Sequence, residues 1–141
     1  MQHSVIALRR TVRKHTKKKR RGCLKNRMHE VSIAQGLLEI AIDSCKKQGF
    51  SGIELIRVKI GKAAGIMTDS LHFAFETLKE GTIAEKAVLT INEIPVSGFC
   101  DSCNKGFSVE EAYVLSCPLC GSKSFRVETG RELNIDEMEV S

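Results

Sequence analysis

The stretch "CDSCNKGFSVEEAYVLSCPLC", from Cys100 to Cys120, contains two C-x-x-C pairs with thirteen residues between them. Two residues between cysteines form a tight turn that aims both sulfurs at one metal ion, and two such turns complete a tetrahedral four-sulfur site. The central spacing leaves room for a short hairpin. The stretch therefore predicts an inserted zinc-ribbon domain over residues 98–127, with the ligands Cys100, Cys103, Cys117 and Cys120.

The choice of metal depends on the residues around these cysteines. Four thiolates suit zinc and also iron, so an iron-based electron-transfer protein is an alternative. "CPLCG" fits an iron site of the rubredoxin type, whereas "CDSCN" and an aromatic content of only 5% favour structural zinc. A closed four-cysteine zinc site has no open coordination position, so it is expected to stabilise the domain without catalysing a reaction. Disulfides are less favoured because no secretory signal is recognisable.

Apolar residues recur at three- and four-residue steps in two segments outside this domain, which is typical of amphipathic helices. The first helix is expected over about residues 30–48, ended by Gly49, and the second from Thr68 or Asp69 as cap to Gly81. The apolar positions are Val31, Ala34, Leu37, Leu38, Ala41, Ile42 and Cys45 in the first helix, and Leu71, Ala74, Phe75 and Leu78 in the second.

Three segments alternate apolar and polar residues, which is typical of strands covered on one face. They are "IELIRVKIG" at 53–61, "AVLTINEIP" at 87–95, where Pro95 stops the strand, and "RELNIDEMEV" at 131–140. The expected fold class is therefore α+β: a small three-stranded sheet packed with two helices, plus the inserted four-cysteine zinc-ribbon domain.

Charge is distributed unevenly along the chain. Residues 1–27 contain eleven of the 22 Lys/Arg and none of the 17 Asp/Glu, so residues 28–141 retain 11 basic and 17 acidic residues, a net charge of −6. One-signed charge with few apolar residues cannot form a core, so residues 1–27 are predicted to be a basic extension that is disordered or not translated. A nucleic-acid-binding zinc-ribbon protein using this arm is an alternative function, which the acidic remainder argues against.

Several classes of protein and site are disfavoured. No apolar run approaches the ~20 residues of a membrane-spanning helix, so a soluble, cytoplasmic protein without a membrane partner is expected. No Ser/His/Asp set, phosphate-binding glycine loop or paired carboxylate site is visible, which argues against an enzyme. Cys45 is interpreted as a small core residue and His72 as a surface or boundary residue.

Five segments carry a resemblance to a known family: "MHEVSIAQGLLEIA", "VKIG" followed by "DSLHFAFETLKEGT", the strand ending "NEIP", the two cysteine pairs, and "GRELNIDEMEV". Through them residues 28–141 resemble the HypA/HybF nickel-incorporation proteins of hydrogenase maturation. The resemblance implies a metallochaperone that carries Ni(II) to the [NiFe]-hydrogenase large subunit and works with a HypB-type GTPase. Members often self-associate, which leaves a homodimer open. Residues 28–97 and 128–141 would form the nickel-binding α+β domain.

The resemblance also implies a nickel site at Met28-His29-Glu30, with His29 as a ligand and Met28 and Glu30 contributing backbone nitrogens. The Glu30 side chain could equally serve the positive end of the first helix. A free α-amine, an ionised amide and an adjacent imidazole form the planar nitrogen set that Ni(II) prefers. Because that amine is lost if Arg27 precedes Met28, translation is expected to start at Met28.

Residues 1–27 contain a second candidate nickel site, formed around the amine of Met1. Met1-Gln2-His3 also places a histidine in third position after an amine, which is a second planar Ni(II) chelate, but we interpret it as a coincidence. Cys23 has no expected role. The sequence leaves open the client hydrogenase, any role toward urease and the geometry of nickel coordination.

Overall fold

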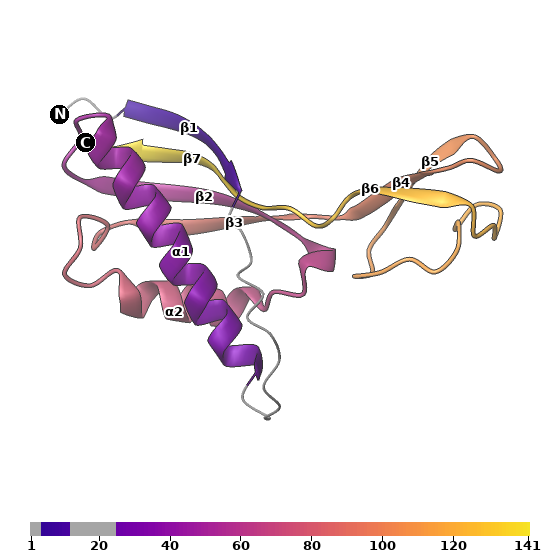
Figure 1. The fold of residues 1–141 in the computed structure, drawn as a ribbon, viewed down its shortest axis with the longest axis horizontal. Coiled ribbons are helices and arrows are strands. Elements are labelled where there is room, and N and C mark those ends of the chain that lie inside the picture. Colours follow the sequence, from indigo (N-terminus) through magenta and orange to yellow (C-terminus); the bar gives the residue numbers. More distant parts are fainter. Residues whose placement is uncertain (1–3, 12–24) are drawn as a thin grey trace. The chain divides into compact units, whose positions relative to one another are not determined.

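The computed structural model describes residues 4–11 and 25–141 of the chain (Figure 1). The chain divides into two compact units. The helical unit comprises Met1–Val58, Ile66–Ile91 and Asn134–Ser141, and the cysteine unit comprises Lys59–Gly65 and Asn92–Leu133. The sequence predicted a narrower zinc-binding domain, over 98–127, because only the cysteines and their nearest neighbours carry a local signal.

Two helices pack against each other in the helical unit: α1, Lys25–Lys47, and α2, Thr68–Leu78. They correspond to the two predicted helices, although α1 begins five residues earlier than the predicted residue 30. Val31, expected on the apolar face, is 45% exposed, while the neighbouring Glu30 is only 3% exposed. Glu30 therefore belongs to the buried face of α1. The core also contains Ile33, Ala34, Leu37, Leu38, Ala41 and Cys45 of α1, and Leu71, Ala74 and Phe75 of α2.

The cap of the second helix differs from the prediction. The N-cap residue is Met67, with extended backbone and no side-chain hydrogen bond of its own, so neither Thr68 nor Asp69 is the cap. Both of these residues lie inside the first turn of α2, where the carboxylate of Asp69 favours the positive end of the helix dipole.

One sheet contains four strands in the order β1-β7-β2-β3. The three predicted strands are β2, Ile53–Gly61, β3, Val88–Ile94, and β7, Leu133–Val140. Ile56, Val58 and Ile60 of β2 are buried, as the alternation predicted. On the other face, Arg57 of β2 forms an ion pair with Glu137 of β7.

The fourth strand of this sheet, β1, was not predicted. Ser4–Thr11 form β1 and pair antiparallel with β7. The sequence assigned all of residues 1–27 to a disordered or untranslated extension, whereas the structure has a strand at Ser4–Thr11. Charge dominated that prediction, whereas Ile6 is apolar and is 7% exposed opposite Met138. Residues 12–24, which include most of the basic residues of the extension 1–27, lie outside the described part of the chain.

The cysteine unit contains a second sheet of three short strands in the order β5-β4-β6. They are β4, Val96–Cys100, β5, Lys105–Val109, and β6, Phe125–Thr129. A short 3-10 helix, η1, Lys62–Ala64, also belongs to this unit. The antiparallel pair β4–β5 forms a hairpin whose turn contains the first cysteine pair. Only β5 lies within the thirteen residues between the cysteine pairs, where the sequence left room for a hairpin.

Within 4–11 and 25–141, no helix combines the length and apolar character needed to cross a bilayer.

Candidate metal centre

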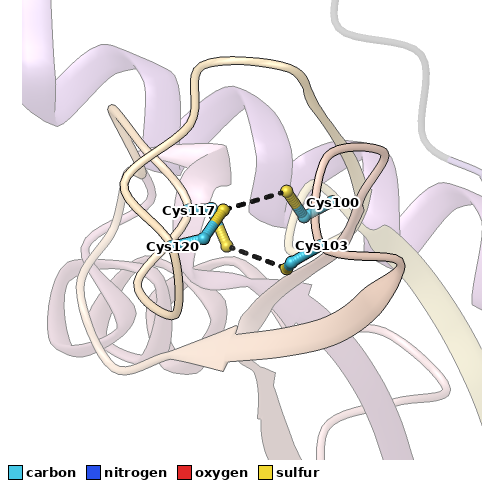
Figure 2. A group of neighbouring side chains, drawn as sticks. All are labelled: Cys100, Cys103, Cys117 and Cys120. Atoms are coloured by element: carbon cyan, nitrogen blue, oxygen red, sulfur yellow. Dashed lines mark hydrogen bonds between the residues drawn. The ribbon is translucent and has the colours of Figure 1, made fainter.

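The four predicted cysteine ligands converge in the cysteine unit. Figure 2 shows their sulfurs pointing toward one another, and all four Sγ atoms lie within 4.8 Å of each other. Cys100 and Cys120 are 3.6 Å apart and Cys103 and Cys117 are 3.9 Å apart, measured between Sγ atoms. A tetrahedral zinc ion with Zn–S bonds of about 2.3 Å would separate its sulfurs by about 3.8 Å. A disulfide would need about 2.05 Å, so these cysteines are free and spaced for a metal ion.

Each cysteine pair is followed by a residue in the left-handed backbone region. Asn104 has φ of 54° and Gly121 has φ of 76°. Asn and Gly are the residues that adopt this region at least cost, so each allows the chain to turn sharply after the second cysteine of its pair. The sequence itself indicated both turns, because an asparagine or a glycine directly follows each C-x-x-C pair.

Hydrogen bonds close the turn that contains Cys117 and Cys120 and join it to the turn that contains Cys100 and Cys103. Gly121 N–H donates to Cys117 O at 2.8 Å, and Cys117 N–H donates to Ser122 O at 2.8 Å. The hydroxyl groups of Ser102 and Ser122 lie 2.7 Å apart and link one turn to the other. These hydrogen bonds hold the two turns in the arrangement that presents their sulfurs to one point.

A small apolar cluster supports the site. Cys100, Phe107 and Cys117 are buried together, with Val109, Val114 and Phe125 packed around them. The rings of Phe107 and Phe125 meet edge to face, with centroids 5.8 Å apart. Both rings belong to the apolar cluster that contains two of the four cysteines, a role that the sequence analysis did not assign to either phenylalanine.

The protein environment gives the cysteine thiols different pKa values. Burial opposes ionisation of Cys117, but backbone N–H groups of Cys120 and Leu119 donate to its sulfur and lower its pKa to about 7. Burial, followed by hydrogen bonding to the other cysteines, raises the pKa of Cys103 to about 12. Cys117 therefore offers a thiolate to a metal more readily than Cys103 does. The donor set and spacing are consistent with a structural zinc site.

The predicted nickel residues lie at the start of α1, and the structure describes the side chain of only one of them. The backbone of Met28 and His29 is helical, but their side chains lie outside the described residues. Glu30 is described and buried. Its Oε1 accepts a hydrogen bond of 3.2 Å from the Met67 N–H. The carboxylate that the sequence associated with the first turn of its own helix therefore caps the other helix, α2.

The remaining candidate residues have simpler outcomes. Cys45 is buried in the core, as predicted, and its thiol donates to Gly52 O at 3.7 Å. Burial raises its pKa, which suits a core residue better than a ligand. His72 is half-buried on α2, as expected for a boundary residue. His3 and Cys23 lie outside the described residues.

Comparison with known proteins identifies relatives over the acidic part of the chain. Residues 28–140 match the family described as "Hydrogenase/urease nickel incorporation, metallochaperone, hypA". The hydrogenase maturation factor HypA of Methylocella silvestris is 35% identical over 113 residues, which cover 80% of this chain and 99% of that protein. The corresponding factor of Azotobacter vinelandii is 37% identical over the same shares of both chains.

Solved structures agree with this match. The solution structure of the Ni metallochaperone HypA from Helicobacter pylori superposes with a TM-score of 0.58 at 26% identity, covering 79% of this chain and 96% of that one. A second HypA solution structure gives a TM-score of 0.61 at 27% identity, covering 81% and 97%. The fold, the paired cysteines and the match from Met28 onward agree, and the chain belongs to the HypA family of hydrogenase and urease nickel-incorporation metallochaperones.

Proposed function

We propose that this protein binds Ni(II) at Met28-His29-Glu30 and delivers it to the large subunit of a [NiFe]-hydrogenase. One observation carries the proposal: the match to nickel-incorporation metallochaperones begins at Met28, the residue that must supply a free amine. The factors of Methylocella silvestris and Azotobacter vinelandii are covered over 99% of their own length by 113 residues of this chain. These relatives therefore have no counterpart of residues 1–27, which supports Met28 as the first residue of the working protein.

The position of Met28 on α1 explains why the start matters. In an α-helix each N–H donates to the carbonyl four residues earlier, and only the first four N–H groups lack a partner. Because α1 begins at Lys25, Glu30 lies beyond its first turn and its N–H faces Asn26. In a chain that begins at Met28, the amides of His29 and Glu30 have no such partner and are open to a metal. The amine and imidazole then complete the planar nitrogen set that Ni(II) favours.

Glu30 has a separate task in this proposal. Its Oε1 is occupied by the Met67 N–H, so its backbone nitrogen and not that oxygen is the proposed nickel contact. The carboxylate anchors the nickel-binding turn to the beginning of α2.

The two metals have different roles. We propose that Cys100, Cys103, Cys117 and Cys120 hold a resident zinc ion, which stabilises the cysteine unit and leaves no open position for chemistry. Nickel is the cargo and is bound elsewhere, in the helical unit. The protein is proposed to act in the cytoplasm as a carrier, not an enzyme. A partner, a HypB-type GTPase, would hydrolyse the nucleotide, and a homodimer is compatible with this role.

The intact mass of the protein from its own cells, measured under denaturing conditions, tests the proposed start. Mass spectrometry should find a chain beginning at Met28. Nickel titration of that chain by calorimetry should then show a tight site that His29→Ala abolishes, because the imidazole closes the planar chelate.

Two controls make the result specific. His72→Ala removes a histidine of the same unit and should leave nickel affinity unchanged. Extending the chain by residues 1–27, with His3→Ala to remove the second amine chelate, should weaken nickel binding because Met28 loses its free amine. Equal affinity for nickel with and without the extension would overturn the proposed site.

A further inference from the structure

The sulfurs of the cysteine cluster that face each other at hydrogen-bonding distance belong to different turns (Figure 2). The two pairs are Cys100 with Cys120, 3.6 Å apart, and Cys103 with Cys117, 3.9 Å apart. A disulfide has an S–S bond of about 2.05 Å, so each pair needs to close by less than about 2 Å to form one. The geometry therefore favours two disulfides that join the turns over disulfides within a C-x-x-C pair.

Cys120 is the member of the cluster that solvent reaches most easily. It is exposed, whereas Cys100 and Cys117 are buried and Cys103 is half-buried. A Cβ at the adjacent Gly121 would meet nothing within 4 Å apart from its own chain neighbours, so the space beside Cys120 is open. Peroxides oxidise exposed thiolates, and a second cysteine nearby converts the product into a disulfide. Cys120 meets the first condition and supplies Cys100 with the second.

We propose that the cysteine cluster is a modification site for hydrogen peroxide, at which Cys120 is oxidised first and Cys100 resolves it into a disulfide. Cys103 and Cys117 then form a second disulfide, and the zinc ion is released. The inference rests on the proposed zinc site and goes beyond it, because it gives the same four sulfurs a second, metal-free state.

Each disulfide consumes one molecule of hydrogen peroxide. The Cys120 thiolate attacks one peroxide oxygen, so that an S–O bond forms, the O–O bond breaks and the departing hydroxide takes up a proton to become water. The Cys100 thiolate then attacks the sulfur of this sulfenic acid, the S–S bond forms, and the S–O oxygen leaves as a second water after protonation. The two sulfurs together lose two electrons. Zinc leaves as the divalent ion because its ligand is the thiolate.

The test uses the full-length, zinc-loaded protein with Cys23→Ser, which leaves Cys45 and the four cluster cysteines. Zinc content is measured first, by atomic emission, so that the zinc site is tested before any oxidation. Hydrogen peroxide is then added, and a chromogenic chelator follows the released zinc. We expect one zinc ion to leave for two peroxide molecules consumed, and a dithiol reductant with added zinc to restore the starting state. Cys45, buried in the helical core, should stay unmodified.

Mass spectrometry then identifies the disulfide partners. Cleavage after Lys105 separates the two turns, so disulfides between the turns leave two fragments joined, whereas a disulfide within a turn leaves them apart. Further cleavage before Asp101 and fragmentation before Pro118 separate the cysteines of each pair. The expected connections are Cys100–Cys120 and Cys103–Cys117.

Matched variants that keep all four ligands test whether the placement of the turns directs this pairing. Ser102→Ala removes the hydroxyl that lies 2.7 Å from Ser122 on the other turn. It should slow disulfide formation between the turns by about twofold or more, as expected from loss of one hydrogen bond. Ser108→Ala, the same change at an exposed position of β5, should leave the rate unchanged.

The failures of the two proposals are distinguishable. Reduced protein without zinc would contradict the zinc site and this inference with it. With zinc present at the start, disulfides within each turn, retention of zinc during oxidation, or irreversible oxidation of Cys120 would each overturn the inference alone. Equal rates for Ser102→Ala and Ser108→Ala would contradict the role given to the placement of the turns.

Discussion

Glu30 joins the beginnings of the two helices through a single buried side chain. Its Oε1 accepts from the Met67 N–H, and its Oε2 is buried with no hydrogen-bond partner among the described residues. Met67 caps α2 without a side-chain hydrogen bond of its own, so Glu30 supplies the missing acceptor from the other helix. A carboxylate in this position also favours the positive end of the α2 dipole.

Glu30→Ala should therefore lower the free energy of unfolding by about 1–3 kcal/mol, the usual cost of leaving a buried donor unpaired. Glu30→Gln retains an acceptor oxygen and should cost less. Urea denaturation of the zinc-loaded protein measures both changes. Glu39→Ala, an exposed glutamate on the same helix, is the control and should stay within about 0.5 kcal/mol of the parent. Equal losses for Glu30→Ala and Glu39→Ala would show that the hydrogen bond to Met67 is unimportant.

Cys117 should dominate the pH dependence of zinc binding near neutrality. Its lowered pKa of about 7 means that it is a thiolate above pH 7 and a thiol below it. Metal binding displaces protons from protonated ligands, so one additional proton must be displaced once the pH falls through about 7. The plot of log zinc affinity against pH should become steeper by about one proton over pH 8 to 6. Chelator competition at several pH values measures this slope, and a constant slope would contradict the assignment.

Among secondary-structure elements, β4 is positioned by the absence of one side chain. A Cβ at Gly98 would overlap the carbonyl oxygen of Arg126 on β6 and approach the Phe107 ring at 3.0 Å. A Cβ at Gly106, on the neighbouring β5, would meet its nearest atom at an ordinary 3.8 Å. Glycine at 98 therefore permits the close backbone approach that brings β4 and β6 together around the site.

Gly98→Ala should destabilise the cysteine unit by about 1–3 kcal/mol, the usual cost of inserting atoms into a packed site. Gly106→Ala should leave it nearly unchanged, and the two variants add the same methyl group to adjacent strands. Zinc retention during chelator challenge measures the difference. If both variants lose zinc at the same rate, backbone approach at Gly98 does not limit the site.

The sequence predicted the elements whose signals are periodic and local. The strand 53–61 coincides with β2, and both helices and the other two long strands were located to within a few residues. The short strands β5 and β6 carried no comparable alternation, and β1 was obscured by the arginines that end it. Its pairing depends on the free edge of β7, more than 120 residues away, which no local pattern encodes.

For the molecule as a whole, the two candidate sites differ in how far sequence reasoning reaches. The four cysteines lie within 21 residues, and their spacing alone predicted the cluster that the structure shows. The nickel site remains a prediction, because it depends on where the chain starts and on side chains outside the described residues. The link between Glu30 and Met67 spans 37 positions and had no sequence signal. Long-range contacts of this kind arise only from packing of the helices.

The two units should also respond differently to removal of zinc. The buried cluster around the four cysteines consists of Cys100, Phe107 and Cys117, two of which are proposed ligands, so this cluster depends on the metal. The helical unit buries many larger side chains, including Leu37, Phe75 and Met138. A core that small does not sustain a fold alone, whereas the helical core needs no metal.

Chelation of zinc should therefore speed hydrogen exchange throughout β4, β5 and β6 while α1 and α2 stay protected, as measured by mass spectrometry on proteolytic fragments. Adding zinc back should restore protection, which excludes irreversible damage by the chelator. Simultaneous loss of protection in both helices would mean that the units fold as one cooperative body. Retained protection confined to the helical unit would mean that the segment of the proposed nickel site keeps its fold independently of zinc, as expected if one metal is structural and the other is cargo.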